Sequence, residues 1–260
     1  MASSTAVTLD RAIIVAAGRG QRMGELTEAR PKCLLPVGGQ PLFERALATL
    51  RRCGVRDISV VRGYRSDLMV HAGVRWFENP RYLETNIFAS LWCAREAFAG
   101  GFIFLYSDIV VTEPVIRAAL ESTADLGVVV DRRWQPLYEG RHSHPVEQAE
   151  LVAADATGHV KRIGKQRIVP PDEAYGEFIG VARVSARGVA ALKAVGEQVF
   201  APGSRGPVHQ ATSSDQTYFT DAVQLLVDAG HQVSAIPIDG GWQEIDTMQD
   251  YERAQERWAR

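Results

Sequence analysis

The sequence predicts an α/β protein whose core is a mostly parallel, doubly wound sheet, in a single domain with a small β-rich insertion. Short apolar runs of strand length alternate with longer segments in which apolar residues recur at helical spacing. The alternation lapses over residues 131–150, which are aromatic and charged, and a hairpin pattern follows. No stretch has the composition of an interdomain linker, and 260 residues can bury one sizeable core.

The first half of the chain supplies most of the strand and helix alternation. The apolar run 11–16 is typical of a buried strand, and a polar loop with several glycines follows it to residue 39. Pro41 opens a segment with apolar residues at helical spacing, and Gly54 ends it. The other elements expected here are strands at 57–61, 74–77, 102–106 and 127–130 and a helix at 86–98.

The second half begins with the insertion and then returns to the alternation. The segments 149–153 and 159–163 flank D-A-T-G, which predicts a hairpin. The glycine-, proline- and serine-rich stretch 201–214 is expected to be a mobile loop. The remaining expected elements are strands at 176–185 and 233–238 and helices at 219–229 and 247–258.

Composition and charge exclude several classes of protein. A hydrophobic content of 46% and a charged content of 23% rule out a mainly disordered, collagen-like or coiled-coil chain. The 29 Lys and Arg against 31 Asp and Glu give a formal net charge of −2. Binding along nucleic acid needs a basic surface, so we expect no nucleic-acid partner, although a local basic pocket for a small anion remains open.

The cysteines and the N-terminal residues indicate in which cellular compartment the protein is expected. Three cysteines at spacings of 20 and 40 residues match neither a zinc site nor a redox pair, and we interpret them as reduced thiols. Residues 1–10 lack the basic and apolar segments of a signal peptide. No apolar run approaches the roughly 20 residues of a membrane helix. We therefore expect a cytoplasmic protein without a membrane partner.

Two segments of the long loop after the first strand could bind phosphate groups. In A-A-G-R-G-Q-R-M (16–23), Gly18 and Gly20 let backbone N–H groups approach an anion, while Arg19 and Arg22 add positive charge. The segment matches neither a P-loop nor the dinucleotide fingerprint, and a glycine turn alone is as often an ordinary tight turn. In R-P-K-C-L-L-P (30–36), Lys32 lies between two prolines on the same loop, from which it could reach the phosphates.

Together the two segments resemble a family signature. G-x-G-x-R-M followed by P-K-x-L-L-P-V-x-G-x-P-L is similar to the motifs of nucleotidyltransferases that activate phosphorylated compounds with an NTP. The resemblance implies a Rossmann-like, doubly wound mixed sheet over residues 1–260, with 11–130 mainly binding nucleotide and 131–260 mainly binding the acceptor. Gln21 stands where many members have Thr. The resemblance implies nucleotide-binding roles for Ala17, Gly18, Arg19, Gly20, Arg22 and Lys32, and catalytic roles for Arg22 and Lys32.

Two acidic residues follow expected strands. Asp108 lies in L-Y-S-D-I-V-V and Asp246 in W-Q-E-I-D-T, at strand ends, where open α/β sheets bind ligands. Such an aspartate seen alone is more often a capping residue. The family resemblance implies instead that Asp108 and Asp246 hold Mg²⁺ together with the nucleotide phosphates. Ser107 replaces the glycine often found before the first aspartate.

A fourth group of motifs concerns the two substrates. E-N-P-R-Y-L-E-T-N-I-F-A-S-L-W (78–92) resembles a segment of the cytidylyltransferases for phosphocholine and 2-aminoethylphosphonate. The resemblance places Asn86 and Ser90 near the pyrimidine nucleotide, although Ile87 replaces a second asparagine. Residues 130–150 and V-K-R-I-G-K (160–165) resemble the acceptor side of the phosphonate branch. By this resemblance Lys165 is catalytic at the acceptor phosphoryl group, and the substrate-binding residues are Arg141, Glu150, Lys165 and Glu177.

The insertion allows plainer interpretations as well. Trp134, Tyr138 and Trp242 fit ordinary packing aromatics. His142 and His144 form an H-x-H pattern, but no third ligand has zinc-site spacing, so we expect both on an exposed insertion rather than at a metal. Arginines 132, 133 and 141 favour an anionic acceptor.

The resemblance implies a Mg²⁺-dependent cytidylyltransferase that uses CTP and a small phosphonate or phosphorylated acceptor. Two alternatives stay open: a sugar-1-phosphate nucleotidyltransferase with another NTP, and a non-catalytic nucleotide-binding module. Choline-like, aminoethyl and carboxylated acceptors all fit. A homodimer is the expected assembly, because dimers are the commonest oligomers of such enzymes.

Overall fold

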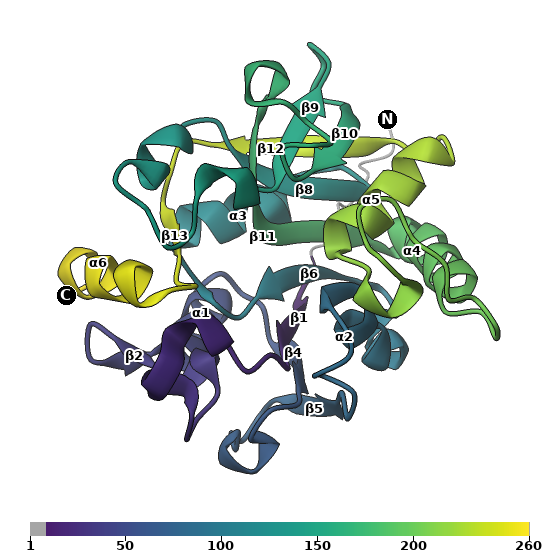
Figure 1. Ribbon diagram of the computed structural model, residues 1–260. Helices are drawn as coiled ribbons and strands as arrows, with labels where there is room; N and C mark the ends of the chain where they lie inside the picture. Colours follow the sequence, from purple (N-terminus) through teal and green to yellow (C-terminus); the bar gives the residue numbers. More distant parts are fainter. Residues whose placement is uncertain (1–8, 260) are drawn as a thin grey trace.

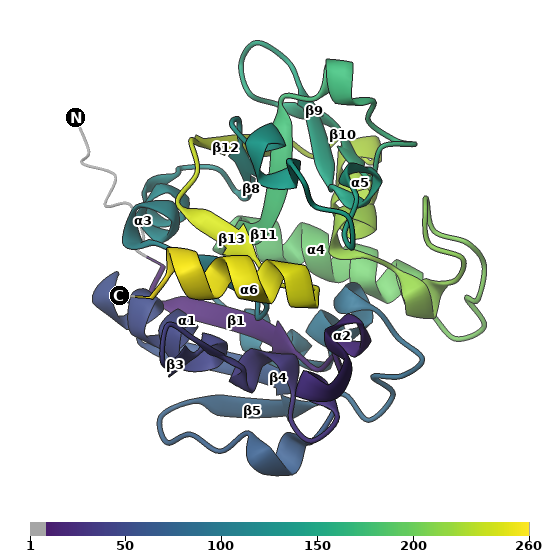
Figure 2. The ribbon, with the colours of Figure 1, turned by 60° about the vertical axis from the view of Figure 1, so that its left-hand side comes forward.

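The computed structural model describes residues 9–259, so most of the N-terminal segment considered above lies outside the described residues. Its centre is a nine-stranded sheet with helices on both faces (Figures 1 and 2). The strands of this sheet are β1 (Arg11–Ala16), β4 (Asp57–Arg62), β5 (Arg75–Glu78), β6 (Gly101–Tyr106), β8 (Leu126–Asp131), β9 (Leu151–Ala154), β10 (Val160–Gly164), β11 (Gly176–Ser185) and β12 (Val233–Ile238).

The sheet is mixed rather than mostly parallel. β1 pairs in parallel with β4 and β6, and β12 pairs in parallel with β8. The long strand β11, however, runs antiparallel to both β6 and β8. A strand buried on both faces has the same apolar pattern in either orientation, so the sequence pattern could not show this reversal.

Residues 9–259 contain six α-helices, of which the first five cover the two faces of the sheet and the sixth packs beside the loop after β1. They are α1 (Leu42–Arg52), α2 (Ile87–Cys93), α3 (Glu113–Glu121), α4 (Ala186–Val199), α5 (Phe219–Asp228) and α6 (Met248–Arg257). Buried residues of α2, α4 and α5 share one apolar cluster with the sheet, and those of α1 and α3 share another. Strand β1 serves both clusters, because Ile13 and Val15 face the first and Ala12 and Ile14 face the second. The doubly wound arrangement is therefore confirmed.

The expected strands and the 149–163 hairpin are present, with ends that differ by a few residues. The expected helix at 86–98 divides into α2 and a 3₁₀ turn over Arg95–Phe98. Helices α3 and α4 were not predicted, although Ser185 caps α4 by accepting hydrogen bonds from the backbone N–H groups of Arg187 and Gly188. Two small ribbons were missed too: β2 (Pro36–Val37) with β3 (Gln40–Pro41), and β7 (Ile109–Val111) with β13 (Trp242–Glu244).

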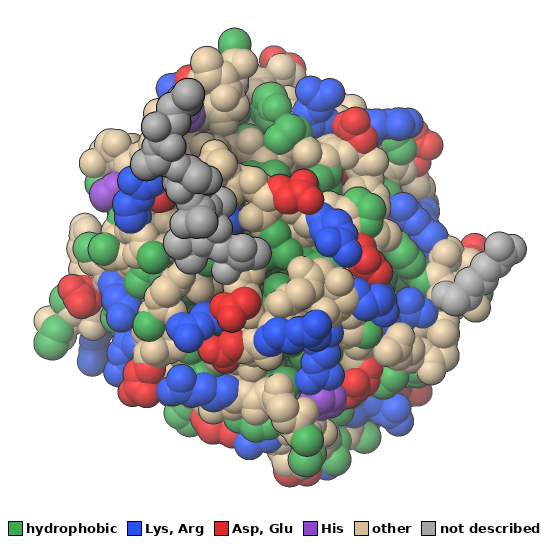
Figure 3. Space-filling view, turned by 180° about the vertical axis from the view of Figure 1, so that it is seen from behind, with side chains coloured by type: hydrophobic (Ala, Val, Ile, Leu, Met, Phe, Trp, Pro, Cys, Tyr) green, Lys and Arg blue, Asp and Glu red, His purple; other side chains and the backbone are tan. Residues whose placement is uncertain are grey.

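The surface agrees with the balanced charge of the chain. On the face shown in Figure 3, Lys and Arg side chains are interspersed with Asp and Glu, and no extended basic area forms. Within residues 9–259, no helix is long and apolar enough to cross a membrane. The three cysteines are free thiols, with Cys33 buried.

Candidate active site

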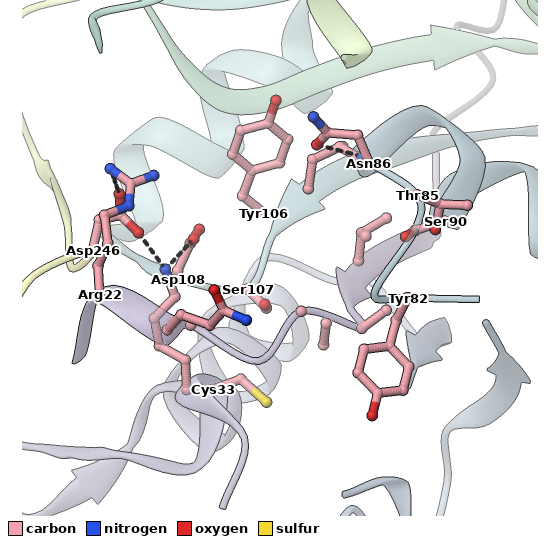
Figure 4. Close-up of a pocket in the computed structure, with 18 residues that line it drawn as sticks. Arg22, Cys33, Tyr82, Thr85, Asn86, Ser90, Tyr106, Ser107, Asp108 and Asp246 are labelled. Atoms are coloured by element: carbon pink, nitrogen blue, oxygen red, sulfur yellow. Dashed lines mark hydrogen bonds and ion pairs between the residues drawn. The ribbon is translucent and has the colours of Figure 1, made fainter. Parts of the chain in front are cut away.

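A cavity of about 340 Å³ opens at the carboxyl ends of β1 and β6. Its walls come from the loop after β1, the start of α2, the end of β6 and the segment after β13. Figure 4 shows Asp108, Asp246 and Arg22 at one end, and Asn86, Thr85 and Ser90 at the other. The site thus lies at strand ends on the edge where open α/β sheets bind ligands.

The glycine loop forms one wall and lies directly on Lys32. Gly20 has φ +72°, a left-handed conformation that favours glycine, and a Cβ there would be 2.8 Å from Lys32 Cβ. Gly18 has open space where a Cβ would be. The loop therefore needs glycine at residue 20 to keep its backbone against Lys32. Arg19 was expected at the nucleotide, but its guanidinium lies 5.5 Å from the Tyr64 ring centroid, and Arg19 does not line the cavity.

Lys32, Asp108 and Asp246 meet at one end of the cavity. The Lys32 ammonium lies 2.7 Å from Asp108 Oδ2 and 2.9 Å from Asp246 Oδ1. The β7–β13 ribbon brings the two aspartates together, because the backbone N–H of Ile245 donates to the Asp108 carbonyl. Burial alone would lower the pKa of Lys32, but the two carboxylates outweigh it and raise this pKa above its usual range. The lysine therefore stays charged.

Arg22 adds a second cation to the same end. Its Nη1 atom lies 2.6 Å from Asp246 Oδ2, and its side chain is 55% exposed. Burial alone would raise the pKa of Asp246, but Lys32 above all, with help from His144 and Arg22, holds it far below its ordinary value. Because Arg22 is exposed and its partner also pairs with Lys32, Arg22 is free to turn toward an anion in the cavity.

The start of α2 lines the opposite end of the first cavity. Asn86 caps this helix through its side-chain oxygen, which accepts a hydrogen bond from the Ile87 N–H. Ser90 is buried, and its hydroxyl oxygen accepts a hydrogen bond from Asn79 Nδ2 at 2.9 Å. Both Asn86 and Ser90 line the cavity, as does Thr85.

A second cavity, of about 30 Å³, lies beyond Tyr106, which lines both. Three carboxylates line it: Glu150, Glu177 and Glu244. Glu150 accepts hydrogen bonds from the hydroxyls of Tyr106 (3.1 Å) and Thr220 (2.7 Å). Burial nevertheless raises the pKa of Glu150 to about 7. The cavity thus carries three carboxyl groups in a small volume.

Glu177 has the most buried carboxylate of this second cavity. One oxygen accepts a hydrogen bond from the Tyr138 hydroxyl, while Oε2 has no hydrogen-bond partner among the described residues 9–259. Burial raises the pKa of Glu177 well above its ordinary value. The unpartnered oxygen therefore faces a space suited to a hydrogen-bond donor or a cation.

The other residues expected at the acceptor lie beside this cavity. Lys165 donates a hydrogen bond to Gln148 Oε1 at 2.9 Å and lies 4.9 Å from the Tyr218 ring centroid. Arg141 is buried and pairs with Asp250 at 2.6 Å and Glu244 at 2.9 Å. Through the ion pair with Asp250, the Arg141 guanidinium links the insertion to α6. A direct contact between Arg141 and an acceptor stays a prediction.

The expectation that both histidines of H-x-H are exposed is wrong for His144. Its side chain is 6% exposed and lies beside Asp246 and Glu244, whereas His142 is exposed. The insertion folds back over the segment after β13, which the sequence pattern could not show. Tyr106 and Glu244 were also missed, although Glu244 precedes Asp246 by two residues in a near-extended segment, which is a detectable signal.

Comparisons with known proteins agree with this geometry. Residues 12–169 match the model of the MobA-like NTP transferase domain. The chain is 28% identical over 252 residues to the CTP:phosphoglutamine cytidylyltransferase of Campylobacter jejuni, covering 93% of this chain and 97% of that one. It is 37% identical over 160 residues to the 2-aminoethylphosphonate cytidylyltransferase of Lancefieldella rimae, covering 59% of this chain and 60% of that one.

A solved structure confirms the fold. The inositol-1-phosphate CTP transferase of T. maritima superposes with a TM-score of 0.72 at 20% identity, covering 96% of both chains. Sugar-phosphate nucleotidyltransferases are also among the sequence relatives. The mixed sheet, the glycine loop over Lys32 and the family match lead to one conclusion: this chain belongs to the MobA-like NTP transferase domain family of nucleotidyltransferases.

Proposed function

We propose that the protein transfers CMP from CTP to a small phosphorylated or phosphonate acceptor and releases pyrophosphate. The observation that carries the proposal is the convergence of Lys32, Asp108 and Asp246 at one end of a cavity whose other end carries Asn86 and Ser90. Cationic and carboxylate groups suit a triphosphate with its metal, and polar groups suit a base. The relatives named as cytidylyltransferases support CTP as the nucleotide.

The proposed reaction is an in-line displacement. An acceptor phosphoryl oxygen attacks the α-phosphorus of CTP, the bond to the bridging oxygen breaks, and pyrophosphate leaves with that oxygen. The acceptor oxygen is already largely ionised at neutral pH, so no general base is needed. Catalysis then depends on positioning and charge stabilisation. Lys32 stabilises charge at the α-phosphate, and Arg22 and the N–H groups of the loop at 17–22 hold the β- and γ-phosphates.

Asp108 and Asp246 would hold Mg²⁺. Their oxygens converge on one cation, the Lys32 ammonium, at 2.7 and 2.9 Å, so the donor set fits a hard divalent ion with oxygen ligands. When bound, Mg²⁺ neutralises phosphate charge and fixes the geometry of the triphosphate. Asp246 keeps its charge at neutral pH because its pKa is lowered by Lys32.

The second cavity supports an acceptor that carries a positive group. Two of the three arginines that favoured an anionic acceptor are engaged elsewhere: Arg132 is exposed and faces Asp239, and Arg141 pairs with Asp250. The cavity instead offers the carboxyls of Glu150 and Glu177. We expect an ammonium group of the acceptor to bind there and to lower the pKa that burial raises in Glu177. Lys165, beside Gln148, would hold the phosphoryl end.

The direct test is pyrophosphate release with Mg²⁺, CTP and a panel of acceptors. The panel holds phosphocholine, 2-aminoethylphosphonate, 2-hydroxyethylphosphonate, phosphonoformate and glucose 1-phosphate, and CTP is compared with UTP, dTTP and GTP. We expect release with CTP and an amine-bearing acceptor. Release only with glucose 1-phosphate and another NTP would contradict the proposal and support the sugar-phosphate alternative.

The charge of the acceptor is tested by Glu177→Gln. We expect KM for an amine-bearing acceptor to rise at least tenfold, with little change for 2-hydroxyethylphosphonate, because only the ammonium loses its counter-ion. Glu147→Gln, which changes an exposed glutamate of the insertion, is the control. Equal losses with both acceptors would show that Glu177 does not recognise the amine.

A further inference from the structure

His144, Glu244 and Asp246 form a compact group where the two cavities meet. One possible ligand atom from each residue lies within 4.8 Å of the other two. His144 Nδ1 is 3.1 Å from Asp246 Oδ2 and 3.6 Å from Glu244 Oε2. The insertion supplies the imidazole, and the carboxylates come from β13 and the residues after it. Segments about a hundred residues apart in sequence thus place three donor atoms around one point.

The His144 imidazole faces Asp246 with its Nδ1 atom but makes no well-formed hydrogen bond there. Its side chain is 6% exposed, and Nδ1 makes no hydrogen bond within residues 9–259, although Asp246 Oδ2 lies 3.1 Å away and Glu244 Oε2 3.6 Å away. A buried polar atom left unpaired costs about 1–3 kcal/mol. The unfilled hydrogen-bonding capacity of Nδ1, between two carboxylates, is an independent observation that favours a ligand shared by these three side chains.

The spacing of the donor atoms suits a single metal ion. Two ligands that bind one ion at 2.0–2.1 Å lie about 2.8–3.4 Å apart, from octahedral to tetrahedral geometry. The distances of 3.1 and 3.6 Å from His144 Nδ1 are close to this range. The separation of the Glu244 and Asp246 oxygens is at most 4.8 Å, so the two carboxylates would have to turn toward each other to share the ion.

We propose that His144, Glu244 and Asp246 bind a divalent first-row transition metal ion, beside the Mg²⁺ that Asp108 and Asp246 would hold. One imidazole nitrogen with two carboxylates favours Mn²⁺, Co²⁺ or Zn²⁺ over Mg²⁺, which prefers oxygen ligands and water. Asp246 is shared by the two positions. The inference goes beyond CMP transfer, because the free protein can bind such an ion without nucleotide or acceptor.

Arg22 competes with this ion for the same oxygen. Its guanidinium lies 2.6 Å from Asp246 Oδ2, the oxygen that also faces His144 Nδ1. A metal ion on this oxygen therefore has to displace Arg22. If CTP draws Arg22 to its phosphates, as proposed above, nucleotide binding strengthens metal binding at His144.

The test is calorimetric titration of the nucleotide-free protein with Mn²⁺ in a constant excess of Mg²⁺. We expect a site for one Mn²⁺ ion that His144→Ala weakens at least tenfold and that Arg22→Gln tightens. His142→Ala is the matched control, since it removes an exposed histidine two residues away. His144→Gln, which keeps more of the buried volume, is measured in parallel, with thermal melts of both variants to verify folding.

Two results would overturn the proposal. One is equal Mn²⁺ affinity in wild type and in both His144 variants, which would mean that the histidine only packs against the carboxylates. The other is loss of Mn²⁺ binding in Asp108→Asn with no effect of His144→Ala, which would put all binding at Asp108 and Asp246. Pyrophosphate release in Mg²⁺ alone is assayed separately, so a negative titration leaves the proposed function standing.

Discussion

Glu150 has a carboxyl group whose replacement should stabilise the protein while impairing acceptor binding. The group is enclosed by Tyr106 and Thr220 in the acidic second cavity, and burial raises its pKa from 4.5 to about 7. The folded protein therefore holds a proton that the unfolded chain releases between about pH 4.5 and pH 7. Stability contributed by this group is present at low pH and is lost as the pH rises through that range.

The size of the change in stability follows from the rise in the pKa of Glu150. A rise of about 2.5 pKa units corresponds to about 3 kcal/mol of folding free energy lost between pH 4.5 and pH 8. Glu150→Gln cannot ionise, and its amide can still bond both hydroxyls. We expect the variant to be more stable than wild type at pH 8 by up to about 3 kcal/mol, or roughly 6–10 °C in Tm, with little difference near pH 4.5.

The assay is thermal unfolding of wild type, Glu150→Gln and Glu147→Gln from pH 4.5 to pH 8. Glu147 is exposed on the same insertion, so its replacement should leave the pH dependence of Tm unchanged. A Tm difference between Glu150→Gln and wild type that stays constant over this pH range would refute the reasoning. The KM of an amine-bearing acceptor should rise in Glu150→Gln, which would show that the destabilising carboxyl serves binding.

Three further predictions concern the end of the cavity that would hold the phosphates. Lys32→Met should lower kcat about 10²–10³-fold, since it removes the charge at the α-phosphate. Mg²⁺ should raise the Tm of this variant more than that of wild type, because Asp108 and Asp246 lose their shared cation. Arg22→Gln should raise KM for CTP more than it lowers kcat, as steady-state kinetics at varied CTP would show; an unchanged KM would exclude a phosphate contact. Gly20→Ala should lower kcat/KM at least tenfold, since φ +72° costs about 1–2 kcal/mol for alanine and the new methyl would meet Lys32; wild-type rates would show that the loop adapts.

Several features of this protein could be predicted from the sequence because they depend on local patterns. Apolar runs mark the strands whatever their partners, and the D-A-T-G turn joins neighbouring strands that pair directly, as β9 and β10 do. The glycine loop and Lys32 were recognised because residues 16–32, a single stretch of the loop, carry both. The meeting of Lys32 with Asp108 and Asp246 was implied only by the family resemblance, and their proximity in the structure agrees with it.

Other features depend on how distant segments pack, and only the tertiary structure decided them. The orientation of β11 depends on its neighbours β6 and β8, because its own apolar pattern is the same in either direction. His144 is buried beside Asp246 because the insertion folds back over the segment after β13, a contact between residues 102 positions apart. Arg141 has its charge satisfied by Asp250 for the same reason. Hydrophobic periodicity determines which residues are buried in each element, whereas the charges that meet in a site are determined by the packing of whole elements.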